Sequence, residues 1–208
     1  MLLDLKDLQS KYGINLKTVL HVGAHKAEEL SLYENLGAKS VIWIESNSNL
    51  ANELKQKLAF PFNTVVEATI ADVDGRKITF NTANNSQSSS ILALGEHAQL
   101  FPDVRYYKSE EKVAVTLSTV VENLCRNFDE IGFLNLDIQG AELLALKGCG
   151  EKIRKIPFIY TEINSRPVYE DCAILEEIDQ YLSEFGYSRT ETAFWNDHPW
   201  GDALYIRQ

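Results

Sequence analysis

Short apolar runs alternate with segments of helical periodicity along most of this chain, and this alternation limits the folds available to it. The apolar, β-branched runs are expected to be strands over 18–24, 40–46, 63–72, 131–140 and 156–164. Helical patterns follow the first strand to about Gly37, include Leu50, Leu54 and Leu58 after the second strand, and cover 141–148 and 171–185. Strands separated by helices need crossover connections, which make neighbouring strands parallel. The pattern therefore predicts an α/β fold with a doubly wound, mostly parallel sheet.

The last part of the chain departs from this alternation. Residues 187–195 and 202–208 both have a strand pattern, with only a short turn between them. Such a hairpin pairs its strands antiparallel, so we expect an antiparallel strand at one edge of the sheet. Residues 73–82 add an Asp-Gly turn and an edge strand. With 208 residues, no internal repeat and no linker, the chain fits a single domain over 1–208.

The segment 81–117 is rich in amides and hydroxyls and has little apolar pattern. Long irregular insertions in compact domains are often binding loops or lids. We therefore expect 81–117 to be an irregular insertion that covers an acceptor site. A flexible surface loop is the alternative.

Charge and composition exclude several classes of partner. The formal net charge of −10 disfavours binding to nucleic acid, whose affinity depends largely on phosphate neutralisation. No apolar run approaches the ~20 residues that span a bilayer, and the acidic, amphipathic N-terminus is not a signal peptide. The single, scattered residues Cys125, Cys149 and Cys172 suggest free thiols, a cytoplasmic protein and no zinc site.

The loop after the first strand indicates a ligand site. In open α/β sheets ligands bind beyond the carboxyl ends of the strands, and Gly23 would let a ligand approach the backbone there. The helix start that follows would favour an anionic group. Glu45 ends the second strand 22 residues later, at a spacing that suits hydrogen bonds to ribose hydroxyls. A dinucleotide would need G-x-G-x-x-G, but only one of the three glycines is present. The loop therefore favours S-adenosylmethionine over NAD.

Acidic side chains end two more strands. Asp137 ends the buried part of the strand expected over 131–140, while Glu162 and Asn164 end the strand over 156–164 and point the same way. These three polar groups are expected to gather at adjacent strand ends. Pairing of Glu162 with Arg166 is the alternative. Glu142 falls in a first helical turn, where stabilisation of the helix start explains an acid.

Several segments together give the chain a family resemblance. The segments are "VLHVGAHKAEEL", "VIWIESNSNL", "SSSIL", "LNLDIQGAELLALKG", "IYTEIN" and "WGDALYIRQ", in this order from residue 18 to the end. The sequence resembles the FkbM-type family of S-adenosylmethionine-dependent methyltransferases in its compact form. The resemblance implies a Rossmann-like, class I methyltransferase sheet of seven strands with the last antiparallel. It also implies methylation of a hydroxyl, often on a sugar or natural product. His21, Ala27 and Gln139 depart from the usual pattern.

These inferences give a set of expected site residues. We expect the cofactor S-adenosylmethionine to contact His21, Gly23, Ala24, His25, Glu45, Ser46, Ala68 and Asp137. The proton acceptor is expected to be Asp137, then Glu162, with His97 third because a lone histidine in a polar loop is often only solvated. A magnesium ion at Asp137, Glu162 and Asn164 is conceivable, but no metal is predicted.

The expected acceptor is a small molecule or glycan with many hydroxyls. Ser88, Ser89, Ser90 and Asn164 supply neutral donors and acceptors for it, and Trp195 and Trp200 could stack on a sugar. Two other classes stay open: an NAD-dependent oxidoreductase of similar fold, and a non-catalytic nucleotide-binding module. The sequence does not indicate an oligomeric state.

Overall fold

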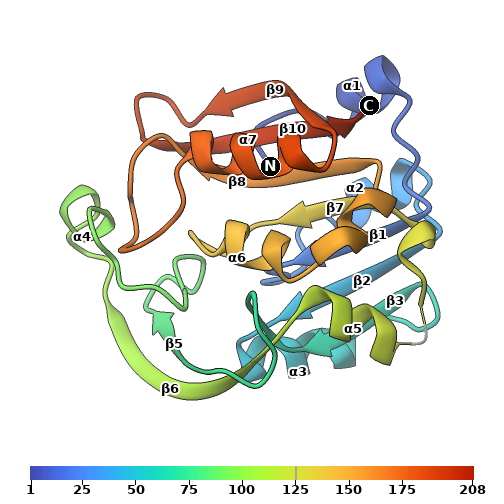
Figure 1. The fold of residues 1–208 in the computed structure, drawn as a ribbon. Coiled ribbons are helices and arrows are strands. Elements are labelled where there is room, and N and C mark those ends of the chain that lie inside the picture. The colour runs from blue at the N-terminus through green and yellow to red at the C-terminus, as the bar shows by residue number, and fades with distance from the viewer. Residues whose placement is uncertain (125) are drawn as a thin grey trace.

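The computed structural model describes residues 1–124 and 126–208, which are built around a sheet of seven strands (Figure 1). In spatial order the strands are β3 (Asn63–Glu67), β2 (Ser40–Glu45), β1 (Thr18–Val22), β7 (Ile131–Leu136), β8 (Phe158–Asn164), β10 (Trp200–Arg207) and β9 (Tyr187–Phe194). The last strand, β10, pairs antiparallel with β8 and β9, while the other pairs are parallel. The predicted seven-stranded, mostly parallel sheet with an antiparallel last strand is confirmed. The last strand, β10, is not at the edge of the sheet, because it lies between β8 and the edge strand β9.

Helices cover both faces of this sheet. On one face lie α1 (Leu5–Tyr12), α2 (Leu30–Asn35) and α3 (Ser48–Lys57), and on the other lie α5 (Leu117–Asn123), α6 (Glu142–Lys147) and α7 (Leu175–Glu184) with the 3-10 turns η1 (Phe128–Glu130) and η2 (Gly150–Lys155). Because both faces are covered, β1 and β7 are buried along their whole length. This is why the central strands are continuous apolar runs in the sequence.

The order of the strands creates a switch point between β1 and β7. From β1 the chain passes outward through β2 and β3, and it returns to the centre of the sheet only with β7. The carboxyl ends of β1 and β7 therefore lie side by side, with helices leaving them on opposite faces. Ligands in open α/β sheets bind at such a point.

The segment 81–117 is more regular than predicted. It contains the end of β5 (Lys77–Ala83), the short helix α4 (His97–Leu100) and the ten-residue strand β6 (Tyr106–Val115). Strands β4 (Thr69–Ile70), β6 and β5 form a second, three-stranded sheet, which extends below the main sheet in Figure 1. The irregular part is limited to the residues on either side of α4, 84–96 and 101–105. The strand expected over 63–72 is also divided at Ala68, because β3 joins the main sheet and β4 the small one.

Some predicted boundaries were wrong. The helix expected directly after the first strand begins only at Leu30, because residues 23–29 form turns with a left-handed backbone at several positions. The helix expected over 171–185 is α7, which begins at Leu175. The final hairpin is β9 and β10, as predicted.

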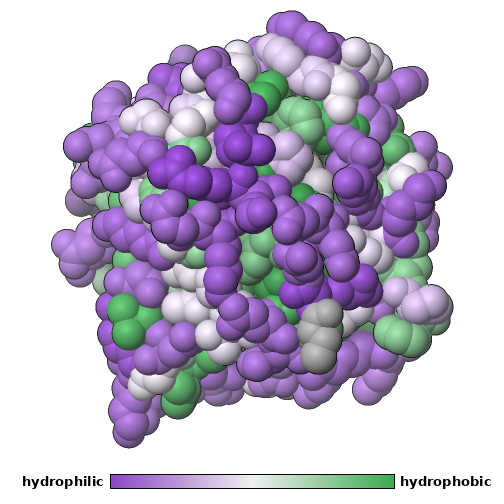
Figure 2. Space-filling model, turned by 45° about the vertical axis from the view of Figure 1, so that its right-hand side comes forward, coloured by the Kyte–Doolittle hydropathy of each residue, from purple (hydrophilic) through white to green (hydrophobic). Residues whose placement is uncertain are grey.

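The surface shows no large apolar region on the face drawn in Figure 2, where hydrophobic residues form small groups among hydrophilic ones. No helix among the described residues is long and apolar enough to cross a membrane. Cys149 and Cys172 are buried free thiols, whereas Cys125 lies outside the described residues.

Candidate active site

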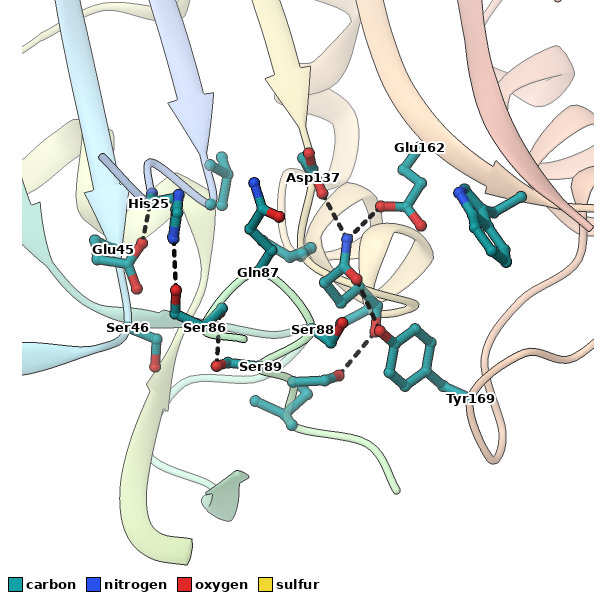
Figure 3. A pocket seen from close by; sticks show the side chains of 18 of the residues that line it. His25, Glu45, Ser46, Ser86, Gln87, Ser88, Ser89, Asp137, Glu162 and Tyr169 are labelled. Atoms are coloured by element: carbon teal, nitrogen blue, oxygen red, sulfur yellow. Dashed lines mark hydrogen bonds between the residues drawn. The ribbon is translucent and has the colours of Figure 1, made fainter. Parts of the chain in front are cut away.

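A cavity of about 580 Å³ opens at the switch point of the sheet. The ends of β1, β2, β7 and β8 form one side of it, and residues 85–91 form the opposite wall (Figure 3). Its size falls within the range of about 300–1,000 Å³ that is typical of small-molecule sites.

The lining of this cavity is acidic. Its carboxylates are Glu28, Glu29, Glu45, Asp137, Glu162 and Asp202. Within the described part of the chain, the lining includes no lysine and no arginine. A positive group at the rim is the amino group of Met1, 4.0 Å from Glu29. The electrostatic potential of such a cavity favours neutral or cationic ligands over phosphates.

Gly23 ends β1 for a different reason from the one predicted. Its φ is +89°, and a Cβ added there would lie 1.8 Å from the carbonyl oxygen of Asp137, the residue directly after β7. The glycine is therefore required by the close approach of two strand ends, whether or not a ligand also approaches it. A bulky residue at this position would disrupt the switch point itself.

The loop after Gly23 keeps a glycine-like backbone without further glycines. His25 and Ala27 have φ values of +45° and +57°. Ala27, one of the residues that depart from the usual family pattern, thus has a left-handed conformation without being glycine. His25 Nδ1 donates to Glu28 (2.7 Å), and His25 Nε2 lies 2.8 Å from Ser86 Oγ. The imidazole therefore joins the first loop to the opposite wall (Figure 3).

Glu45 lies at the end of β2, as predicted, and faces the cavity. One carboxylate oxygen accepts from the backbone N–H of His25 (2.8 Å) and the other from that of Asn47 (2.7 Å). Burial raises the pKa of Glu45, although these two N–H groups act in the opposite direction. Ser46 bonds Thr69 through their hydroxyls (2.5 Å), and Ser46 and Ala68 both line the cavity beside Glu45.

Two of the other expected cofactor residues, His21 and Ala24, are almost fully buried and offer little or no surface to the cavity. His21 is 2% exposed at the base of the cavity, where its Nδ1 lies 3.0 Å from the hydroxyl of Tyr33 and its ring packs on Trp43. Burial lowers the pKa of His21. Ala24 is 1% exposed, packs into the core on the α1–α3 side and is not part of the cavity lining. Its backbone N–H bonds Ile44, so it acts on the loop and not on a ligand.

Asp137 and Glu162 meet at the ends of β7 and β8, as the sequence predicted. The side-chain amide of Gln139 donates to Asp137 Oδ1 (2.8 Å) and to Glu162 Oε2 (2.5 Å), and its oxygen accepts from the hydroxyl of Tyr169 (2.7 Å) (Figure 3). Burial, followed by the charges of Asp137 and Glu142, raises the pKa of Glu162 well above its usual range. An amide thus bridges the two acids at the site where a cation was conceivable.

Glu142 lies in the first turn of α6, but its carboxylate bonds the loop before the helix and not the helix start. It is 2% exposed at the beginning of α6, and its Oε1 accepts from the backbone N–H groups of Ile138 (2.9 Å) and Gly140 (3.2 Å). Arg166 does not pair with Glu162, because it bonds Glu96 (2.7 Å) at the surface.

Asp202 is a site residue that sequence reasoning missed. It lies directly opposite Glu162 in the β8–β10 pairing. Its Oδ2 accepts from the hydroxyl of Tyr160 and from the backbone N–H of Leu2, both at 2.5 Å. Burial raises the pKa of Asp202. Asp202 reaches the site only because β10 pairs with β8 in the sheet, and no local pattern in the sequence indicates this pairing.

The three serines expected to bind the acceptor line the cavity, but their hydroxyls are engaged within the protein. Ser88 Oγ lies 3.3 Å from His97 Nε2, Ser89 Oγ donates to the carbonyl of Ser86 (2.8 Å), and Ser90 Oγ donates to the carbonyl of Gln139 (2.8 Å). These bonds hold the loop in place. The side chain of Gln87, by contrast, is exposed and projects between His25 and Asp137 (Figure 3).

His97 is buried, and not solvated as the alternative had it. It is 7% exposed, lines the cavity and packs against Tyr169 and Phe101. Burial lowers its pKa, and its Nδ1 has no hydrogen-bond partner among the described residues. Asn164 is 1% exposed, also lacks partners within the described chain and does not reach the cavity lining. The structure therefore gives Asn164 no direct contact with this cavity.

An aromatic wall flanks the acids. Trp200 packs against Phe101 (5.2 Å between ring centroids) and stacks on His198 (4.4 Å). Trp200, Phe101 and Trp195 all line the cavity, and Trp195 is 49% exposed. The two halves of the cavity thus differ. Backbone loops and Glu45 form the half at the ends of β1 and β2, whereas acids and aromatic rings form the half at β7, β8 and β10.

Solved structures with a similar fold are methyltransferases. Magnesium protoporphyrin IX methyltransferase from Synechocystis PCC 6803 with bound S-adenosylmethionine is 11% identical with a TM-score of 0.52, covering 98% of this chain and 76% of that one. A S-adenosylmethionine-dependent methyltransferase from Listeria monocytogenes is 10% identical with a TM-score of 0.52, covering 99% and 100%. TrmK from M. capricolum with S-adenosyl-homocysteine is 10% identical with a TM-score of 0.52, covering 100% and 70%.

These likenesses show a class I methyltransferase fold. No curated protein matches the chain. The sequence profile of the methyltransferase FkbM domain, however, matches residues 21–189, which include the strand ends with Gly23, Glu45, Asp137 and Glu162. The chain therefore belongs to the FkbM methyltransferase domain family.

Proposed function

We propose that this protein transfers a methyl group from S-adenosylmethionine to a hydroxyl of a sugar, glycan or related polyhydroxylated acceptor. The observation that carries the proposal is the acidic cavity at the switch point, in which Asp137 and Glu162 share the amide of Gln139. Membership of the FkbM family supports the reaction class. The cavity chemistry supports the cofactor and the kind of acceptor.

The residues at the ends of β1 and β2 fit this cofactor. Glu45 faces the cavity and can accept from ribose hydroxyls, while Ser46, Ala68 and the apolar side chain of Leu50 lie beside it. The cofactor carries a sulfonium and an ammonium group against one carboxylate, so an acidic lining suits its net positive charge. A dinucleotide would place a pyrophosphate in a lining that, among the described residues, offers no lysine or arginine.

The acids at β7 and β8 fit the chemistry. When bound, S-adenosylmethionine supplies a methyl carbon activated by positive sulfur. The chain must hold the acceptor hydroxyl in line with this carbon and take up its proton, as the oxygen–carbon bond forms and the carbon–sulfur bond breaks. Burial raises the pKa of Glu162 well above its usual range, and acids with strongly raised pKa values are typical of catalytic sites. Asp137 is exposed at the mouth and can orient the hydroxyl or serve as the acceptor itself.

The opposite wall fits a polyhydroxylated acceptor. Gln87 presents an amide between the two halves of the cavity, and Trp195 and Trp200 present aromatic surface on which a sugar ring can stack. His97 adds an unpartnered ring nitrogen within the described chain.

Two measurements test the proposal. Calorimetry should show one site for S-adenosylmethionine and S-adenosylhomocysteine and none for NAD; the reverse preference would favour an oxidoreductase. Methyl transfer from labelled cofactor should then be screened against free sugars, oligosaccharides, RNA and small phenols. Methylation of RNA or phenols without any carbohydrate would refute the acceptor class, and cofactor binding without turnover on any acceptor would favour a binding module.

A further inference from the structure

Two acids in the acceptor half of the cavity face each other, and neither forms an ion pair with a residue that the structure describes. Glu162 and Asp202 lie directly opposite on neighbouring antiparallel strands, where Cβ atoms are about 4.5–5.5 Å apart and like charges destabilise the pair. Both are largely buried. The lining residues described by the structure include no lysine or arginine to neutralise them. While both carboxylates are charged, such an arrangement is costly unless a ligand brings the missing positive charge; otherwise one of the two acids must hold a proton.

Each of these carboxylates keeps one oxygen available. Glu162 uses Oε2 for the amide of Gln139, and Asp202 uses Oδ2 for Tyr160 and Leu2. Glu162 Oε1 and Asp202 Oδ1 accept no hydrogen bond from the described residues. The protein therefore fixes each carboxylate through one oxygen and leaves the other for a donor within the cavity.

Two further features next to this pair point to a ligand. Trp200 lies two residues before Asp202 on β10, so both side chains leave the same face of the strand, and the indole lines the cavity. Aromatic faces attract ammonium groups, and more strongly where water is excluded. His97, nine-tenths buried in the same lining, keeps Nδ1 without a partner in the described part of the chain.

The cofactor alone does not account for these acids. Glu45, Glu28 and Glu29 already provide negative charge at the β1 and β2 end. The amino group of Met1 lies near Glu29 and also lowers the pKa of Asp202, but it does not contact either free oxygen. A neutral sugar would leave the opposed pair uncompensated.

We propose that the acceptor carries a protonated amine beside the hydroxyl that is methylated, and that Glu162, Asp202 and Trp200 bind this ammonium group. The acceptor class is then a hydroxylated amine such as an amino sugar. This inference rests on the proposed methyltransferase function, because it assigns the second half of the same cavity.

The test is calorimetry of the full chain saturated with S-adenosylhomocysteine, at a pH where amines are protonated. Glucosamine should bind about 10- to 100-fold more tightly than N-acetylglucosamine, which has the same ring without the charge. The preference should disappear in Asp202→Asn, while affinity for S-adenosylhomocysteine stays within a few-fold. Glu53→Gln, an exposed acid on α3, is the matched control and should keep the preference.

Because Asp202 also anchors Leu2 and Tyr160, Glu162→Gln serves as a second variant and should lose the same preference. Equal or weaker binding of glucosamine, including no binding, would overturn the inference, as would a preference that survives both substitutions. Tight Mg²⁺ binding that both variants abolish would also overturn it, because the acids would then be metal ligands. Failure of S-adenosylhomocysteine to bind would instead refute the proposed function, and a methyl group found on nitrogen would refute only O-methylation.

Discussion

Replacement of Glu142 by glutamine tests how much buried charge the site carries. Glu142 is 2% exposed, and burial raises its pKa from the ordinary 4.5 to about 7. Because the folded protein holds this proton more tightly than the unfolded chain, the stabilisation is complete below about pH 4.5 and is lost as the pH rises through about 7. At about 1.4 kcal/mol per pH unit between the two pKa values, the loss is roughly 3 kcal/mol.

The geometry makes glutamine a close substitute. Both backbone donors, Ile138 N–H and Gly140 N–H, bond the same oxygen, so the amide oxygen of glutamine can accept both. The new NH₂ group lacks an acceptor among the described residues and should cost about 1–3 kcal/mol, but at every pH alike. Glu142→Gln therefore changes the pH dependence of stability and not only its level.

Urea denaturation of both proteins at pH 5 and pH 8 measures this difference. The free energy of unfolding of the wild type should fall by roughly 2.5 kcal/mol more than that of Glu142→Gln between the two conditions. Glu45, Glu162 and Asp202 also have raised pKa values and contribute to the fall in both proteins. Glu151→Gln, at an exposed position, is the control and should behave like the wild type. The same fall in wild type and Glu142→Gln would refute the buried-charge argument.

Three more predictions concern the site directly. Glu45→Gln should weaken cofactor binding by about 1.5–3 kcal/mol in calorimetry, and an unchanged affinity would mean that Glu45 only ties down His25 and Asn47. Gly23→Ala should lower the free energy of unfolding by at least about 2 kcal/mol in urea, because its Cβ meets Asp137; wild-type stability would show that the strand ends can separate. Either Glu162→Gln or Asp137→Asn should remove the proton acceptor, and that variant should reduce turnover about 10²–10⁴-fold with cofactor affinity nearly unchanged. Full activity in both variants would mean that another group accepts the proton.

The sheet could be predicted because its central strands are buried on both faces. β1 and β7 are continuous apolar runs with polar residues just beyond them, so both their existence and their ends are visible in the sequence. β6 was missed because most of its residues are at least partly exposed, which leaves charged residues along both of its faces and no alternation. The start of α2 was misplaced because residues 24–29 have helix-like spacing but turn backbone.

The site was predictable only where strand ends define it. Gly23, Glu45, Asp137 and Glu162 follow from the rule that parallel strands present their carboxyl ends at one edge. Asp202 does not, because its position depends on β10 pairing with β8, which no local pattern encodes. The serines show a related limit: a hydroxyl in a polar loop gives no sign of whether it faces a ligand or holds the loop.

Backbone strain is concentrated where the cavity is built. Six residues other than glycine have positive φ in the described chain, and four of them, His25, Ala27, Ser86 and Gln139, belong to the loops around the cavity. Each such residue costs about 1 kcal/mol or more, so it persists only where surrounding contacts fix it. Three have such contacts: the His25–Ser86 bond joins two of the loops, and Gln139 is held by three hydrogen bonds. The bonds of Gln139 therefore hold Asp137 and Glu162 in place and also stabilise the strained backbone at Gln139. Breaking these bonds, or the bond between His25 and Ser86, should loosen the loops around the cavity and the site together.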